Sequence, residues 1–232
     1  NMQLLIEKRL GGQDADPAEV QDLLAAWTDW TDLNDLEGLN GAESDYYETL
    51  DQGYTPRNNP ELDTVEELLH IRGFAELFQG VNLQAAFTIY GNARTVNLNL
   101  ATREAMALLP GLDDQLIENI IAYRQIEDIN NRAEIAEIVP FEELQELSPW
   151  VGNATSNFYS IYAYFESQTN GRDPTLFNGQ DEVIELIPPQ AFMEIVEVNG
   201  FSDLPTILRI DPYGRVPDSL PSKIQEEDYN FR

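Results

Sequence analysis

An acidic segment at residues 29–47 carries the side chains whose types and spacing best suit binding chemistry. Two carboxylates and one carboxamide lie close together in its first arm, and two carboxylates stand one residue apart in its second. Calcium takes six to eight oxygens from such groups and from main-chain carbonyls, and it accepts irregular geometry. A divalent ion would also offset the repulsion between neighbouring carboxylates. The candidate calcium ligands are Asp32, Asn34, Asp35, Glu43 and Asp45.

The spacing of this acidic segment leaves two interpretations open. It is not the spacing of an EF-hand, because no glycine falls at the sixth position counted from Asp32. The segment is therefore either a calcium-binding loop of another kind or a solvated acidic loop that binds nothing.

The rest of the composition excludes several catalytic classes. The chain has no cysteine, which removes disulfides, thiolate metal sites and cysteine nucleophiles. It has one histidine, His70, so a centre built from several histidines is excluded. No Gly-x-Ser-x-Gly elbow, P-loop or dinucleotide fingerprint occurs. Pairs of carboxylates are too common in so acidic a chain to indicate a glycosidase. The residues alone leave a periplasmic hydrolase with a carboxylate pair open, with nothing specific in its support.

A second motif lies at residues 96–124. Leu-Leu-Pro-Gly-Leu at residues 108–112 separates two expected helices, which is typical of a helix-hairpin-helix unit. In DNA-binding versions the hairpin amides and nearby basic side chains grip phosphate. Here Asp113 stands where the second hairpin glycine usually lies, and Asp114 follows it. Two carboxylates at that place disfavour DNA and favour a packing unit.

The net charge of the chain also disfavours DNA as a partner. The 232-residue chain has 13 Lys and Arg against 42 Asp and Glu, a formal net charge of −29. Such a charge favours cations or basic protein surfaces and disfavours nucleic acid and anionic membranes as partners. With 42% hydrophobic residues the chain can still form a core. No apolar run is long enough to span a membrane.

The elements that must position these motifs are helices over roughly the first 150 residues. Asp16 and Pro17 predict the start of a helix that ends near Trp30, directly before the acidic carboxylates. Residues 31–52 contain glycines and no steady period, and are expected to form a long ordered loop. Further helices are expected at residues 65–71, 102–109, 115–124, 132–139 and 141–147, with a β-like stretch at 95–99.

After residue 150 the pattern becomes that of a β-sheet. Aromatic and β-branched runs separated by Gly, Pro and Asn predict strands. They fall at residues 158–165, 183–187, 192–198 and 206–210. The expected fold class is therefore α+β.

Taken together, the motifs resemble one family, the K-type minor pseudopilins of bacterial type II secretion systems (general secretion pathway protein K). The similar segments occur in the family's order between residues 29 and 124. They are Asp-Trp-Thr-Asp at 29–32, Gly-Ala-Glu-Ser-Asp-Tyr-Tyr at 41–47, Tyr-Thr-Pro-Arg-Asn-Asn-Pro at 54–60, Val-Glu-Glu-Leu at 65–68, Arg-Gly at 72–73 and Val-Asn-Leu-Asn-Leu-Ala-Thr at 96–102.

This resemblance implies a pilin-like antiparallel sheet with a large α-helical insert, calcium in the acidic loop, and a place at the pseudopilus tip. It also implies a role without catalysis, in a heterocomplex with I-type and J-type minor pseudopilins that initiates or caps pseudopilus assembly. Family members are anchored in the inner membrane by an N-terminal hydrophobic helix. Because that helix is missing here, the chain is expected to be a soluble periplasmic part of the protein.

The resemblance and the pattern of elements together predict three regions. Residues 1–13 would be a remnant of the pilin-like head, residues 14–150 the helical insert with its helix-hairpin-helix-like unit, and residues 151–232 the rest of the head and a C-terminal tail. The alternative function is a helix-hairpin-helix DNA-binding module of the competence-receptor type, which the charge of −29 disfavours.

Overall fold

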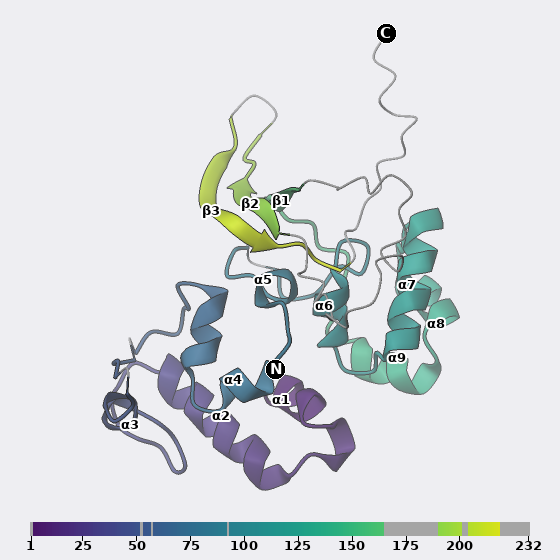
Figure 1. Ribbon diagram of the computed structural model, residues 1–232. Coiled ribbons are helices and arrows are strands. Elements are labelled where there is room, and N and C mark those ends of the chain that lie inside the picture. The colour runs from purple at the N-terminus through teal and green to yellow at the C-terminus, as the bar shows by residue number, and fades with distance from the viewer. Residues whose placement is uncertain are drawn as a thin grey trace, which may run out of the picture. The chain divides into compact units, whose positions relative to one another are not determined.

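The computed structural model describes residues 2–51, 53–56, 58–91, 93–164, 190–200 and 204–218. The chain divides into two compact units (Figure 1). The helical unit comprises Asn1–Thr155 and Pro217–Arg232, and the sheet unit comprises Ser156–Val216. Helices together with an antiparallel sheet confirm the α+β class. Among the described residues, no helix combines the length and apolar character that a membrane crossing needs.

The first half of the helical unit is organised around one long helix, α2 (Pro17–Thr31). Asp16 caps it by accepting a hydrogen bond from the Ala18 N–H at 2.9 Å, and Pro17 occupies the first turn, where no N–H is needed. This confirms the predicted helix and its end. The other elements of this half are α1 (Met2–Arg9), η1 (Gly12–Asp14), α3 (Ser44–Glu48), η2 (Val65–His70), α4 (Phe74–Leu77) and α5 (Leu83–Ala86), of which η1 and η2 are 3₁₀ helices.

A hydrophobic core joins these elements. Ile6 of α1 and Phe74 of α4 are fully buried in it, and Trp27 of α2 stacks on Phe74 with ring centroids 6.0 Å apart. Trp30, at the end of α2, meets the edge of the buried Tyr47 ring at 5.1 Å. The aromatic packing therefore fixes the end of α2 against α3, at the border of the acidic segment.

A second core lies among α6 (Arg103–Ala107), α7 (Asp114–Ile126), α8 (Arg132–Ile138) and α9 (Phe141–Leu147). Thr102 and Asp113 cap α6 and α7 by accepting hydrogen bonds from N–H groups three residues on, at 3.1 and 2.8 Å. The buried Arg124 of α7 donates to the carbonyls of Leu98 and Ala101. These helices confirm the four predicted between residues 102 and 147.

Two local predictions differ from the structure. Residues 31–52 are not loop throughout, because α3 forms at Ser44–Glu48 where Tyr47 is buried between aromatic rings. The β-like stretch at 95–99 contributes only an isolated bridge between Val96 and Val151. There Asn97 accepts a hydrogen bond from the Asn99 N–H at 3.0 Å, which turns the chain away.

The sheet unit contains β1 (Phe158–Ala163), β2 (Gln190–Glu197) and β3 (Thr206–Arg215), in that order and antiparallel. The strands predicted at 192–198 and 206–210 lie in β2 and β3, and β3 continues to Arg215. The strand predicted at residues 183–187 and the end of the one at 158–165 lie outside the described residues.

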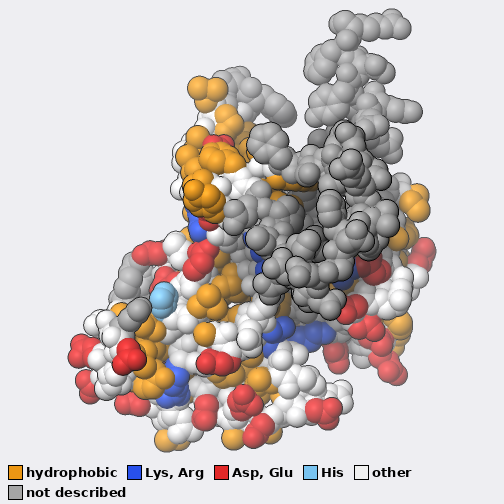
Figure 2. All heavy atoms as spheres, viewed as in Figure 1, with side chains coloured by type: hydrophobic (Ala, Val, Ile, Leu, Met, Phe, Trp, Pro, Cys, Tyr) orange, Lys and Arg blue, Asp and Glu red, His pale blue; other side chains and the backbone are white. Residues whose placement is uncertain are grey.

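One face of this sheet exposes apolar side chains. Ile161, Glu194 and Ile210 are directly opposite one another across the three strands, so their side chains share a face. Ile161 and Ile210 are 50% and 53% exposed. Figure 2 shows hydrophobic side chains gathered over the strands and acidic side chains spread over the helical unit. The sheet thus presents an apolar surface of the kind that protein partners cover.

Candidate metal centre

Three carboxylates from separate places in the chain meet at the end of α2. Asp29 lies in the last turn of α2, Asp32 directly follows the helix, and Glu43 directly precedes α3. Carboxylate oxygens of the three lie within 4.8 Å of one another. Because α3 folds back against Trp30, the loop between them returns Glu43 to the helix end. Asp32 and Glu43 were predicted ligands, so the structure brings two of the five together and adds Asp29.

Glu43 is the most constrained of the three. Its side chain is 3% exposed, and neither carboxylate oxygen has a hydrogen-bond partner. Burial, followed by the negative charges of Asp29, Asp32 and Asp35, raises the pKa of Glu43 to about 7. A buried carboxylate in this position needs either a proton or a cation to be stable.

The backbone of the intervening loop closes around Asp29. Its carboxylate accepts a hydrogen bond from the Gly38 N–H at 3.0 Å. A Cβ on Gly38 would lie 2.9 Å from Asp29 Oδ1, and a Cβ on Gly41 would lie 1.7 Å from Asp29 Oδ2. The two glycines are therefore required by the close approach of the chain to the Asp29 carboxylate.

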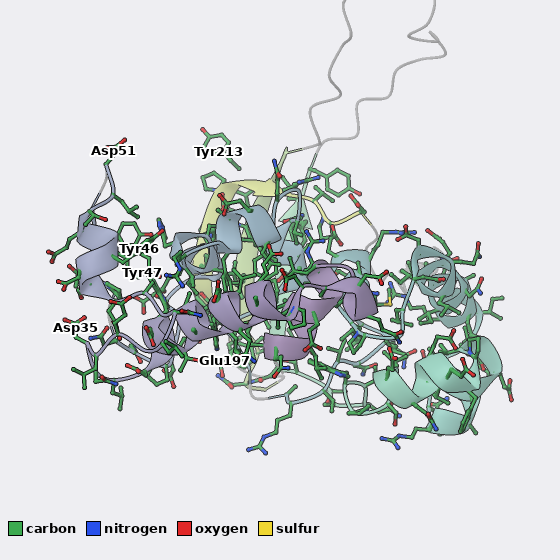
Figure 3. All side chains as sticks on the ribbon, turned by 90° about the horizontal axis from the view of Figure 1, so that it is seen from below. Asp35, Tyr46, Tyr47, Asp51, Glu197 and Tyr213 are labelled. Atoms are coloured by element: carbon green, nitrogen blue, oxygen red, sulfur yellow. The ribbon has the colours of Figure 1, made fainter. Side chains whose placement is uncertain are left out.

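The other three predicted ligands surround this cluster without joining it. Asn34 uses its side-chain oxygen to accept from the Leu36 N–H at 3.0 Å. Asp35 accepts from the hydroxyl and the N–H of Ser44, which lowers its pKa. Asp45 is exposed in the first turn of α3. Figure 3 shows Asp35 with Tyr46 and Tyr47 at one end of the helical unit. Their role as ligands stays a prediction.

Arg72 holds the loop from the other side. Its guanidinium donates to the Gly41 carbonyl at 2.7 Å and to the Asn40 carbonyl, and it lies over the Tyr46 ring, 5.4 Å from the centroid. The backbone N–H of Arg72 donates to the Tyr47 hydroxyl at 3.2 Å. One arginine thus ties the glycine turn of the loop to α3.

Residues 3–80 match the family model for protein K of the type II secretion system. This segment, about a third of the chain, is therefore similar to protein K of the type II secretion system. The matched segment contains the whole three-carboxylate cluster, both loop glycines and Arg72. A comparison with curated protein sequences gives no match.

The match supports a role in type II secretion and an envelope-associated location for the chain. It confirms the family resemblance noted in the motifs at residues 29–73. The pilin-like character of the sheet and the three-region division at residues 1–13, 14–150 and 151–232 stay predictions.

Asp29 is the member of the three-carboxylate cluster that sequence reasoning missed. It opens the acidic segment at residues 29–47 but is not among the five ligands predicted there. Its separation from Asp32 is three residues, which places two side chains on the same side of a helix end. That spacing was the available signal. The spacing of Asp29 and Asp32 does not reveal that the loop brings Glu43 back to the same place.

Replacing Arg72 by alanine should destabilise the helical unit by about 1–3 kcal/mol, because charged hydrogen bonds to two carbonyls are lost. Arg72→Lys should recover only part of this, since an ammonium lacks the planar fork. Urea unfolding monitored by tryptophan fluorescence measures the change. Arg94→Ala, at an exposed arginine, is the control and should leave stability within about 0.5 kcal/mol. Equal effects of the two alanine variants would contradict the role given to Arg72.

The hairpin-like turn between α6 and α7 is in contact with other elements of the helical unit. A Cβ on Gly111 would lie 2.3 Å from the Glu143 carbonyl oxygen, and the Lys8 ammonium donates to the Leu112 carbonyl at 2.6 Å. Asp113 uses its carboxylate to cap α7. The turn therefore packs against α9 and α1, and the DNA-binding alternative has no support in this geometry.

Proposed function

We propose that the chain is a minor pseudopilin at the tip of the type II secretion pseudopilus, on the periplasmic side of the inner membrane. There it forms a complex with I-type and J-type minor pseudopilins that initiates or caps pseudopilus assembly, with no catalytic role. The observation that carries this proposal is the match of residues 3–80 to protein K of the type II secretion system.

The shape of the elements supports a position at a tip. The helical unit contains most of the described chain and two hydrophobic cores, so it is a much larger body than the sheet unit. A subunit with such a body is difficult to stack within a filament of small pilin-like subunits. At the tip nothing is stacked above it, so its size is tolerated there.

The apolar face of the sheet supports an assembly role. Ile161 and Ile210 are half-exposed on the two outer strands, on either side of Glu194 in the central strand. Burial of such side chains is the main favourable term in protein association. We propose that this face contacts a neighbouring minor pseudopilin.

Mixing the chain with the soluble parts of its I-type and J-type partners should give a heterocomplex at micromolar concentration. Size-exclusion chromatography with light scattering measures its mass. Three separate monomer peaks at these concentrations would contradict the proposed function, whatever the chain binds elsewhere.

The double variant Ile161→Glu/Ile210→Glu should weaken this complex at least tenfold, because it places two charges on the apolar face. Isothermal titration with the partners measures the loss. Leu39→Glu adds a charge at a 92% exposed leucine of the acidic loop and should leave the affinity unchanged. If the sheet variant bound as tightly as the wild-type chain, the sheet face would not be the contact.

We also propose that Asp29, Asp32 and Glu43 hold a calcium ion, with Asn34, Asp35 and Asp45 as further sources of oxygen. The donor set consists of oxygens alone, which suits a hard cation. The unpartnered oxygens of Glu43 supply the independent observation that the cluster lacks a positive group. A bound ion would neutralise these carboxylates and tie the end of α2 to the start of α3.

A further inference from the structure

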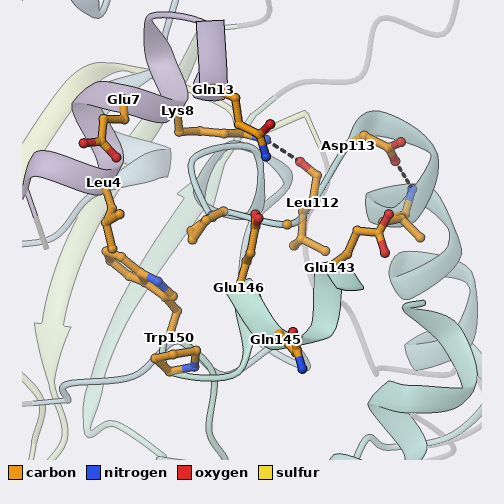
Figure 4. A pocket seen from close by; sticks show the side chains of 15 residues that line it. Leu4, Glu7, Lys8, Gln13, Leu112, Asp113, Glu143, Gln145, Glu146 and Trp150 are labelled. Carbon is orange, nitrogen blue, oxygen red and sulfur yellow. Dashed lines mark hydrogen bonds between the residues drawn. The ribbon is translucent and has the colours of Figure 1, made fainter. Parts of the chain in front are cut away.

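A cavity of about 740 Å³ opens in the helical unit, away from the three-carboxylate cluster. It lies among the α1–η1 segment, the turn between α6 and α7, and the end of α9 (Figure 4). Its volume is in the range of sites that bind small molecules or groups of side chains. The side chains that decide its chemistry are Leu4, Lys8, Leu116, Glu143, Glu146 and Trp150.

One end of the cavity combines the apolar side chains of Leu4 and Trp150 with the carboxylate of Glu7 (Figure 4). Leu4 is 46% exposed although it lies beside the half-buried Trp150, and the two occupy the same end in Figure 4. Pro149 and Pro110 add further apolar surface. An aliphatic or aromatic side chain placed there would remove this surface from water, at about 25 cal/mol for each Å² buried.

The opposite end is acidic. Glu143 and Asp113 lie there in Figure 4, and Glu146 lies between them and the first end. One oxygen of Glu143 is buried and has no hydrogen-bond partner. Among the residues that line the cavity, Lys8 is the cation, and its ammonium is directed to the Leu112 carbonyl. The cavity therefore lacks a donor at Glu143, and a positive group would supply it.

We propose that this cavity binds a segment of another protein that carries an apolar side chain next to a lysine or arginine. The apolar side chain would lie between Leu4 and Trp150, and the cation would pair with Glu143 and Glu146. Charge selects this occupant. A second copy of the chain, with a net charge of −29, is repelled, and a polyanion is repelled by the carboxylates of the cavity.

Fluorescence anisotropy with the whole chain tests the proposal. The probes are fluorescein-labelled nine-residue peptides with a central Leu or Phe flanked by Lys or Arg, and their counterparts with Glu in place of each basic residue. The basic peptides should bind and the acidic peptides should not. Absence of binding by all basic peptides at millimolar concentration would overturn the proposal.

The double variant Glu143→Gln/Glu146→Gln locates the binding. It should weaken peptide affinity at least tenfold. The control Glu19→Gln/Asp22→Asn removes the same charge from two exposed positions of α2 and should change affinity less than twofold. Equal weakening by both pairs would show non-specific attraction and overturn the site.

Two further readouts separate this site from the alternatives. Trp150→Phe should abolish the shift in tryptophan emission that basic peptides produce in the wild-type chain. Sedimentation at rising protein concentration should show no self-association. A dimer that the Leu4→Asp variant dissociates would assign the cavity to a second copy instead, and would overturn the proposal.

Discussion

Removing calcium with EGTA should lower the melting temperature of the helical unit by about 5–10 °C, and added calcium should restore it. A ligand that binds only the folded state stabilises it by about 2.7 kcal/mol at a hundred times its dissociation constant. For a unit of this size that energy corresponds to the stated shift. Differential scanning calorimetry at neutral pH measures it. A melting curve that responds to neither EGTA nor calcium would remove the ion from the proposed function.

The variant Glu43→Gln makes this result specific. Because the wild-type carboxylate is buried without a partner and surrounded by acids, the amide should be as stable as wild type, or more stable, in EGTA. In calcium the order should reverse, since a charged ligand is lost. Glu48→Gln makes the same change at an exposed residue of α3 that is not among the proposed ligands, and so measures the effect of charge alone.

The pH dependence of the metal-free chain provides a second check on Glu43. Its folded-state pKa of about 7 lies above its ordinary value of 4.5, so the fold favours the protonated form. This contribution to stability is complete below about pH 4.5 and is lost as the pH rises through 7. In EGTA the wild-type chain should therefore lose stability over this range relative to Glu43→Gln. Parallel pH profiles would contradict the burial of Glu43 among acids.

Replacing Gly41 by alanine should destabilise the helical unit by about 1–3 kcal/mol and weaken calcium binding, because an added Cβ would lie 1.7 Å from Asp29 Oδ2. The φ angle of Gly41 is not in the left-handed region, so backbone strain does not contribute. Gly38→Ala, where the Cβ would lie 2.9 Å from Asp29 Oδ1, should have a smaller effect. Urea unfolding in EGTA measures the stability, and calcium titration measures the affinity.

A double-mutant cycle with Asp29→Ala identifies the cause of the Gly41 effect. If the Cβ collides with the carboxylate, the cost of Gly41→Ala should nearly disappear when Asp29 is alanine. If the costs of the two substitutions simply add, the glycine serves another purpose. Leu39→Ala, at an exposed position in the same loop, should be neutral and controls for general loop effects.

The helices were predictable because their signals are local. Asp16, Thr102 and Asp113 each cap the helix that follows, within three residues of the cap. The strands β2 and β3 were predictable from runs of apolar and β-branched residues. The short helix α3 was not, because it depends on Tyr47 packing against Trp30 and Tyr54, which lie in other segments.

The candidate metal centre was also predictable only in part. Residue types and spacing by themselves determined that an oxygen-rich site lies in the acidic segment and that Asp32 and Glu43 are candidates for it. They also determined the family resemblance, because the motifs occur in order along the chain. Only the tertiary structure decided that Asp29 joins them in a three-carboxylate group. The physical reason is the close return of the loop, which Gly41 and Arg72 make possible and which brings Glu43, fourteen residues from Asp29, to the end of α2.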